Sequence, residues 1–171
     1  MDTINFNKLL LKTAFACMAC DGDIDKSEVK LIKRLHKESK TFGEIEINTE
    51  LDKLLLAINE NGQQFLRNYF KELIAFDLTE ANELKIIEIA IEIIKADDKI
   101  EYSEVKFFKV IRSKLKIKNE PILEKHPDFE DYLEQDIISE SYLSGLLDDY
   151  FDIHNDIVFN NVLDFKITKD E

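Results

Sequence analysis

The sequence predicts an all-α fold in which two related helical units pack around a shared core. First, the 171 residues are 44% hydrophobic and include 12 Phe, which indicates a folded chain long enough to bury a real core. Second, only four Gly and two Pro are present, which favours long helices over a turn-rich β architecture. Third, a short acidic motif occurs twice between stretches of helical periodicity.

The two copies of the acidic motif are "DGDIDKSEVK" (residues 21–30) and "DDKIEYSEVK" (residues 97–106). They align without a gap, so that residues 27–30 match residues 103–106 in Ser, Glu, Val and Lys. A constant offset of this kind indicates a duplicated structural unit. We therefore expect pseudo-symmetric repeat units over about residues 4–77 and 79–153.

An apolar helix is expected before each motif. Before the first motif, one helical face carries Phe6, Leu10, Thr13, Cys17 and Cys20. Before the second, "LTEANELKIIEIAIEIIKA" is apolar apart from one narrow strip formed by Lys85, Glu88, Glu92 and Lys95. This pattern predicts that the second of these helices is the most buried in the protein.

A basic amphipathic helix is expected after each motif. The residues predicted to face inward are Val29, Ile32 and Leu35 in the first helix, and Val105, Phe108, Ile111 and Leu115 in the second. Two cationic surfaces are predicted on the other faces, formed by Lys30, Lys33, Arg34 and Lys37, and by Lys106, Lys109 and Arg112.

Two further helices are predicted over about residues 48–60 and 62–77. The offset between the motifs predicts their counterparts near residues 124–136, where "HPDF" interrupts the pattern, and near residues 138–153. After residue 155 the pattern does not distinguish between a short strand, an irregular segment and a tail docked on the core.

The charge is unevenly distributed. The whole chain has a net charge of -13. Residues 1–119 contain 21 acidic and 20 basic residues, whereas residues 120–171 contain 15 acidic and three basic residues. Residues 119–171 are therefore interpreted as an acidic C-terminal extension beside a nearly neutral core at residues 1–118. Such a charge opposes binding to nucleic acid. The stretch "SYLSGLLDDYFDIHND" either docks on a basic helix through Leu143, Leu147 and Phe151 or forms a solvated acidic face.

The acidic motifs have two interpretations. In the first, Asp25 caps a helix that begins at Lys26, Glu28 completes a capping box, and Ile24 packs on Val29. In the second, the motifs bind a divalent cation such as Ca²⁺ or Mg²⁺, because capping leaves several acids unexplained. The motif is not an EF-hand, since no Gly stands at its sixth position. The candidate ligands are Asp21, Asp23, Asp25, Glu28, Asp97, Asp98, Glu101 and Glu104.

No catalytic constellation is evident, and we expect no enzymatic activity. Cys17 and Cys20 lie on an apolar face without a second cysteine pair, which indicates structural residues. The three His are scattered, and the four isolated Gly form no phosphate-binding loop. Neither a signal peptide nor a membrane span is recognisable, so we expect a cytoplasmic protein without direct membrane insertion.

The stretches "ACDGDIDKSE" (residues 19–28) and "KADDKIEYSE" (residues 95–104) resemble the duplicated motif of the TerB-like family. That family includes the tellurite-resistance protein TerB and the N-terminal domain of DjlA-type co-chaperones, and the resemblance covers about residues 4–118. It implies an all-helical cytoplasmic protein of the bacterial stress response, without established catalysis. It also implies divalent-cation binding at Asp21, Glu28, Asp97 and Glu104, and protein partners that include a membrane-associated TerC-type protein.

The expected function is thus a non-enzymatic TerB-like interaction module with divalent-cation binding at the acidic turns. Two alternatives stay open, a cation-responsive sensor whose helices rearrange on binding and a co-chaperone-like adaptor. The sensor predicts a cation-dependent change in shape, whereas a constitutive adaptor predicts none.

Overall fold

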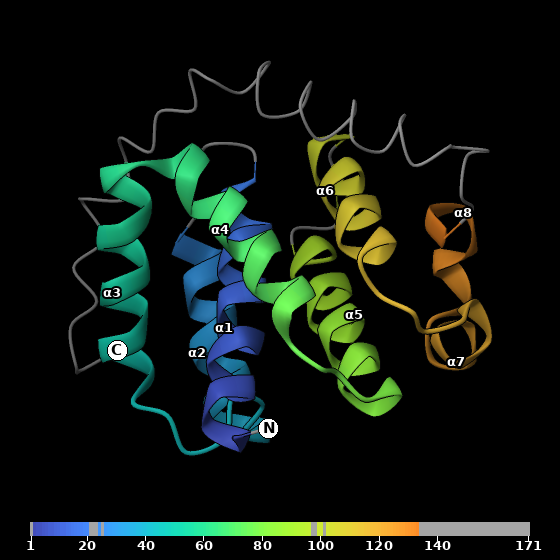
Figure 1. The fold of residues 1–171 in the computed structure, drawn as a ribbon, viewed down its shortest axis with the longest axis horizontal. Coiled ribbons are helices and arrows are strands. Elements are labelled where there is room, and N and C mark those ends of the chain that lie inside the picture. The colour runs from blue at the N-terminus through green and yellow to red at the C-terminus, as the bar shows by residue number, and fades with distance from the viewer. Residues whose placement is uncertain (1, 21–23, 25, 97–98, 101, 134–171) are drawn as a thin grey trace.

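The computed structural model describes residues 2–20, 24, 26–96, 99–100 and 102–133, where all regular secondary structure is helical (Figure 1). The predicted all-α fold is confirmed. The elements are α1 (Thr3–Ala19), α2 (Lys26–Ser39), α3 (Ile47–Glu60), α4 (Gly62–Ala75), α5 (Glu80–Ile94), α6 (Tyr102–Ser113), α7 (Asn119–Lys125), the 3₁₀-helix η1 (Pro127–Phe129) and α8 (Glu130–Leu133).

Helix α1 is the central element of the fold. It contacts α3, α4, α5 and α6, and it buries eleven of its seventeen residues (Figure 1). The prediction that α5 is the most buried helix is wrong, because α5 buries eight of its fifteen residues. The physical reason is that α1 has neighbours on several sides, whereas the polar strip of α5 stays at least partly in contact with solvent.

Aromatic side chains connect the N-terminal helices to α6. The ring of Phe15 on α1 meets Phe65 on α4 edge-on, with centroids 5.7 Å apart. The ring of Phe107 on α6 lies 6.3 Å from Tyr69 and 5.3 Å from Phe70, both on α4. Offset and edge-on ring pairs of this kind add stability beyond the area they bury. Helix α6, which follows the second motif, therefore shares one core with α1 and α4.

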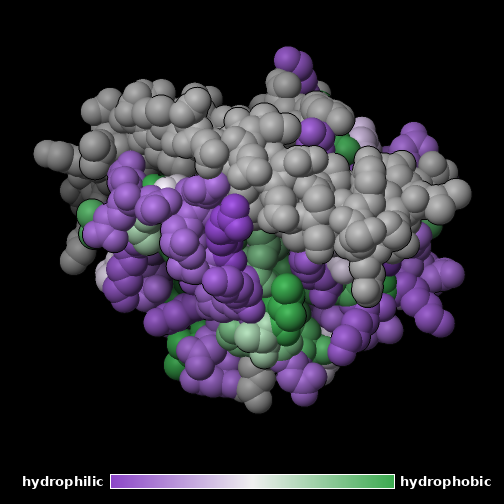
Figure 2. Space-filling view, turned by 45° about the horizontal axis from the view of Figure 1, so that its top comes forward, coloured by the Kyte–Doolittle hydropathy of each residue, from purple (hydrophilic) through white to green (hydrophobic). Residues whose placement is uncertain are grey.

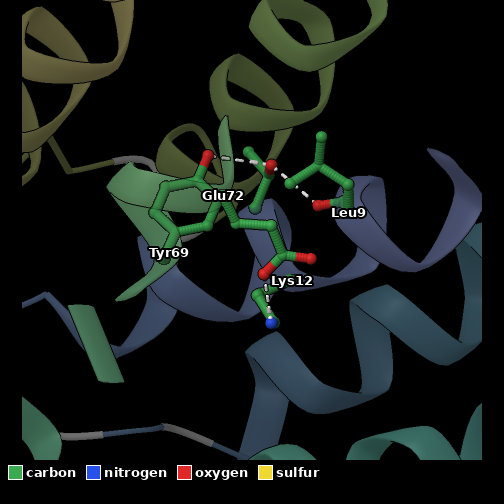
Figure 3. Close-up of polar contacts among 5 residues, drawn as sticks. Leu9, Lys12, Tyr69 and Glu72 are labelled. Atoms are coloured by element: carbon green, nitrogen blue, oxygen red, sulfur yellow. Dashed lines mark hydrogen bonds and ion pairs between the residues drawn. The ribbon is translucent and has the colours of Figure 1, made fainter. Parts of the chain in front are cut away.

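A buried hydrogen-bond chain fixes α4 against α1 (Figure 3). The hydroxyl of Tyr69 donates to Thr13 Oγ1 at 2.9 Å, and the Thr13 hydroxyl donates to the carbonyl of Leu9 at 2.9 Å. Nearer the surface, Lys12 Nζ pairs with Glu72 Oε2 at 2.5 Å. The two contacts give the α1–α4 interface a defined register, since each polar atom has a specific partner.

The helix positions agree with several predicted ranges. Helix α2 begins at Lys26 and α6 begins at Tyr102, which are equivalent positions in the alignment of the two motifs. Helices α3 and α4 correspond to the predicted ranges 48–60 and 62–77. In place of one helix near residues 124–136, α7, η1 and α8 follow one another, because Pro127 cannot continue α7.

Some predictions concern residues outside the described ranges. These are the helix near residues 138–153, the chain after residue 155 and the docking of the acidic extension beyond Leu133. The pseudo-symmetry of the two units also stays a prediction. Among the described helices, none is both long enough and apolar enough to cross a membrane.

The prediction that Arg112 belongs to a cationic surface is wrong. This residue is only 8% exposed, and its guanidinium donates to Asn119 Oδ1 at 2.9 Å. Burial lowers the pKa of Arg112, and the buried carboxylate of Glu83 opposes that shift. The chain after α6 folds back over this side chain and covers it, which the helical periodicity of α6 alone cannot indicate.

Candidate functional site

Most of the predicted cation ligands lie outside the described residues. These are Asp21, Asp23, Asp25, Asp97, Asp98 and Glu101. The structure describes the other two, Glu28 in the first turn of α2 and Glu104 in the first turn of α6. Ile24 and Val29 are both buried, as the predicted helix-capping arrangement requires.

Glu28 and Glu104 both influence one side chain of α1. The pKa of the Cys17 thiol is raised first by its complete burial, and then by the charges of Glu104 and Glu28. Both carboxylates therefore lie within electrostatic reach of the same sulfur atom, although they belong to different copies of the motif. The starts of α2 and α6 thus both lie within electrostatic range of the C-terminal part of α1.

The cysteines themselves do not form a reactive site. Cys17 and Cys20 are thiols that are not joined in a disulfide, and each is 1% exposed. A thiol held neutral by burial is a poor nucleophile and a poor metal ligand, because both roles require the thiolate. Within the described part of the chain, no group of three or more His, Cys, Asp or Glu side chains is placed to hold a metal ion.

A groove of about 770 Å³ lies between α2 and α5. Its lining residues are Ser27, Lys30, Leu31, Arg34 and Leu35 on the α2 side, Ile91, Glu92, Lys95 and Ala96 on the α5 side, and His126 beyond α7. Ser27 belongs to the first acidic motif, and Ala96 directly precedes the second. One part of the groove is therefore adjacent in sequence to both acidic turns.

The groove combines apolar and cationic side chains. Leu31, Leu35 and Ile91 supply apolar surface, and Leu31 and Leu35 are only partly buried. Lys30 and Arg34 are exposed and make no hydrogen bond or ion pair with any other described residue. Among the described residues, the groove therefore presents two exposed cations without an ion-pair partner beside an apolar surface.

The α5 wall of this groove is more balanced in charge. Lys95 pairs with Asp128 and also lies 4.9 Å from the centroid of the Phe129 ring. Enclosure by its surroundings raises the pKa of Glu92, the charge of Glu88 adds to this effect, and His126 opposes it. The Glu92 carboxyl is therefore more easily neutralised than an ordinary surface glutamate.

Helix α2 is the least firmly packed of the long helices. It buries only Val29 and Ile32 among its fourteen residues. The pairs of described elements in closest contact include every helix except α2. Because few buried contacts hold it in place, α2 is the helix that can separate from the core at the lowest cost in free energy.

A second, smaller pocket of about 280 Å³ continues along α5. It is lined by residues of α1, of the chain around Ser39–Thr41 and of α5, where Lys85, Glu88 and Glu92 contribute. The polar strip of α5 predicted from the sequence therefore borders both the groove and the second pocket. The sequence does not reveal the hollows themselves, because they depend on how α2 lies against α5.

The described surface is mostly hydrophilic. Figure 2 shows one face, on which a narrow strip of hydrophobic residues runs between hydrophilic ones. Three large hydrophobic side chains are exposed among the described residues, one on each of three helices: Ile4, Leu56 and Ile74. Isolated exposed residues of this kind are normal and do not mark a site.

Comparison with protein-family models, with curated proteins and with solved structures finds no match to this chain. The resemblance to the TerB-like family rests on the two short motifs, and it stays a prediction.

Proposed function

We propose that this chain is a non-enzymatic, TerB-like interaction module whose acidic turns bind a divalent cation, Ca²⁺ or Mg²⁺. The observation that carries the proposal is the approach of Glu28 and Glu104 to the same thiol of α1. Two carboxylates from different turns that face one region can contribute oxygen ligands to one ion. Oxygen atoms of this kind are the ligands that Ca²⁺ and Mg²⁺ prefer.

The chemistry of the donor set fits a hard cation. Glu104 is 6% exposed and Glu28 is partly buried, so both carboxylates lie at the edge of the core and not on long exposed side chains. The six further candidate ligands, all of them acids, belong to the turns that directly precede α2 and α6. A bound cation would screen the repulsion among these acids and would join the starts of the two helices.

Calorimetric titration of the chelator-treated protein with Ca²⁺, Mg²⁺, Mn²⁺ and Zn²⁺ tests this proposal. We expect saturable binding, and we expect the double substitution Glu28→Gln and Glu104→Gln to weaken it at least about tenfold, since affinity follows the charge of the ligands. The double substitution Glu38→Gln and Glu60→Gln is the matched control, because both of these acids are exposed and lie at the far ends of their helices. Equal binding by the two variants would contradict the proposal.

A cation-responsive sensor is the second candidate function, and the loose packing of α2 favours it. An ion bound at the start of α2 would change how firmly this helix is held against the core. Amide hydrogen exchange of α2 with and without the cation distinguishes the two functions. A sensor requires that exchange in α2 slows on binding, whereas a constitutive module requires no change.

The protein partners are part of the same proposal. The motif resemblance implies a membrane-associated TerC-type protein as one of them. The cationic side chains of Lys30, Lys33, Arg34 and Lys37 on α2 favour acidic surfaces on any partner.

A further inference from the structure

We propose that the groove between α2 and α5 is the docking site for an acidic segment of this chain, residues 141–156. The proposal goes beyond the cation-binding module above, and it does not require a cation at the acidic turns. It assigns the groove an occupant, and it makes that occupant a competitor of any acidic partner protein. The inference rests on the surface of the groove, on its charge and on the length of chain that follows Leu133.

The apolar surface of the groove is incompletely covered by the described residues. Leu31 and Leu35 lie on the face of α2 toward α5, yet both stay partly exposed. Ile91 lines the opposite wall. A groove between two helices with apolar walls suits an amphipathic segment that inserts its apolar side chains.

The charge of the groove specifies what kind of segment fits. Lys30 and Arg34 are one helical turn apart, and neither has a partner among the described residues. In the sequence of residues 141–156, Asp148, Asp152 and Asp156 follow one another at the same four-residue spacing. Acids and bases at matching spacing on facing elements can pair at two positions at once.

Apolar residues accompany these acids in the required order. Leu143, Leu147 and Phe151 also recur every four residues, and Leu147 and Phe151 each directly precede an aspartate. The groove has the same arrangement, with Lys30 next to Leu31 and Arg34 next to Leu35. The segment thus carries a row of acids beside a row of apolar residues. The α2 wall of the groove carries a row of cations beside a row of apolar residues, so the two surfaces are complementary.

The chain leaves the described part of the structure near the groove. His126 lines the groove, and η1 and α8 lead from there to Leu133. Seven residues in helical conformation advance by only about 10–14 Å. The next seven residues, 134–140, can span up to about 23 Å, so residues 141–156 can reach the groove without strain.

Zero-length carbodiimide coupling of lysine to carboxylate, followed by peptide mass spectrometry, tests the proposal on the full chain. Divalent cations are first removed with a chelating resin, so that the result does not depend on the acidic turns. We expect Lys30 to couple to Asp148, Asp152 or Asp156. The ion pair between Lys12 and Glu72 is an internal reference, because it joins α1 and α4 independently of the groove.

Two variants make the test specific. Arg34→Glu reverses a charge that lines the groove and is expected to reduce the Lys30 coupling about five- to tenfold, which corresponds to the loss of a few weak ion pairs. Lys37→Glu is the matched control, because Lys37 is exposed on the same helix but does not line the groove. We expect coupling in the Lys37→Glu variant to equal that of the natural sequence.

Hydrogen exchange gives an independent readout. Neutralising the segment by Asp148→Asn, Asp152→Asn and Asp156→Asn is expected to speed exchange in α2 about five- to tenfold and to leave α1 unchanged. The proposal is overturned if Lys30 couples to none of the three aspartates while Lys12 couples to Glu72. It is also overturned if, in a mixture of isotopically light and heavy protein, the coupled peptides join two copies, because a second copy would then fill the groove.

Discussion

The Oε2 atom of Glu83 accepts a hydrogen bond of 2.6 Å from the backbone amide of Ile117. The same oxygen accepts a second one of 2.9 Å from the amide of Lys116. Glu83 is 6% exposed, and Arg112 is the nearby cation whose charge it stabilises. A single buried carboxylate thereby joins the first turn of α5 to the chain that follows α6.

Removal of this carboxylate is expected to be costly. We predict that Glu83→Ala lowers the free energy of unfolding by about 2–4 kcal/mol, because the buried amide of Ile117 loses its acceptor and Arg112 loses its counter-charge. Urea denaturation measures the loss. Glu80→Ala is the control, since Glu80 is exposed in the same first turn of α5 and should change stability little. Equal effects of the two substitutions would refute the role assigned to Glu83.

The turn between α2 and α3 depends on a glycine. Gly43 has a φ of +64°, and a Cβ atom at this residue would lie 2.1 Å from Asn7 Nδ2. We therefore predict that Gly43→Ala destabilises the fold by about 1–3 kcal/mol, through backbone strain and through displacement of Asn7. Two variants separate the two causes when their thermal and urea unfolding is compared. One is the single substitution Gly43→Ala, and the other is the double substitution of Gly43→Ala with Asn7→Ala.

The double variant, Asn7→Ala with Gly43→Ala, removes only the steric conflict between the new Cβ atom and the Asn7 side chain. It should recover part of the lost stability, and the remainder measures the strain at φ. Gly62→Ala at the start of α4 is a suitable control, because Gly62 does not have a positive φ. If the double variant recovered all the stability or none of it, one of the two causes would be eliminated.

The hydrogen bond between Tyr69 and Thr13 predicts an asymmetry between two substitutions. Thr13→Val leaves the buried Tyr69 hydroxyl without its acceptor, at a cost of about 1–3 kcal/mol. Tyr69→Phe leaves Thr13 still able to donate to Leu9, so its cost should be nearer about 1 kcal/mol. The double variant should be less destabilised than the sum of the two, as chemical denaturation in a double-mutant cycle will show.

Stability is predicted to fall in alkaline solution. Burial raises the pKa of the Cys17 thiol from its ordinary value of 9.0, and burial also raises the pKa of Tyr69 above its ordinary value of 10.0. Above pH 9, the unfolded chain therefore releases protons that the folded chain keeps. The free energy of unfolding is then lost as pH rises, by up to about 1.4 kcal/mol per pH unit for each group.

Urea denaturation at pH 7 to 10.5 measures this loss. Cys17→Ala should reduce the slope above pH 9, even though the variant is less stable at pH 7 because of the cavity that it leaves. Tyr69→Phe should reduce only the part of the slope above pH 10. An unchanged slope in the Cys17→Ala variant would show that this thiol is not the group responsible.

Much of the fold follows from local patterns in the sequence. Helical periodicity predicts α1 to α6 because each of these helices buries a contiguous apolar face. The repeated motif predicts that α2 and α6 begin at equivalent positions, and they begin at Lys26 and Tyr102. The burial of Cys17 and Cys20 follows from the apolar face predicted before the first motif, where Cys17 lies in α1 and Cys20 directly follows it.

The failures concern contacts between distant parts of the chain. Arg112 lies on the polar side of α6 by its spacing, but the chain near Leu115 and Asn119 covers it. The degree of burial of α1 depends on four neighbouring helices, none of which its own sequence specifies. No local rule in the sequence states that Glu28 and Glu104, which belong to different motifs, both lie within electrostatic reach of Cys17.

The central position of α1 has a consequence for synthesis on the ribosome. This helix emerges before the other described helices, and α5 and α6, two of the helices that cover it, emerge only after α2, α3 and α4 have been made. The apolar face of α1 therefore stays exposed on the nascent chain until α5 and α6 have been synthesised and can pack against it. Contacts so distant along the chain also slow the closing step of folding, which cannot occur before Phe107 reaches Tyr69 and Phe70.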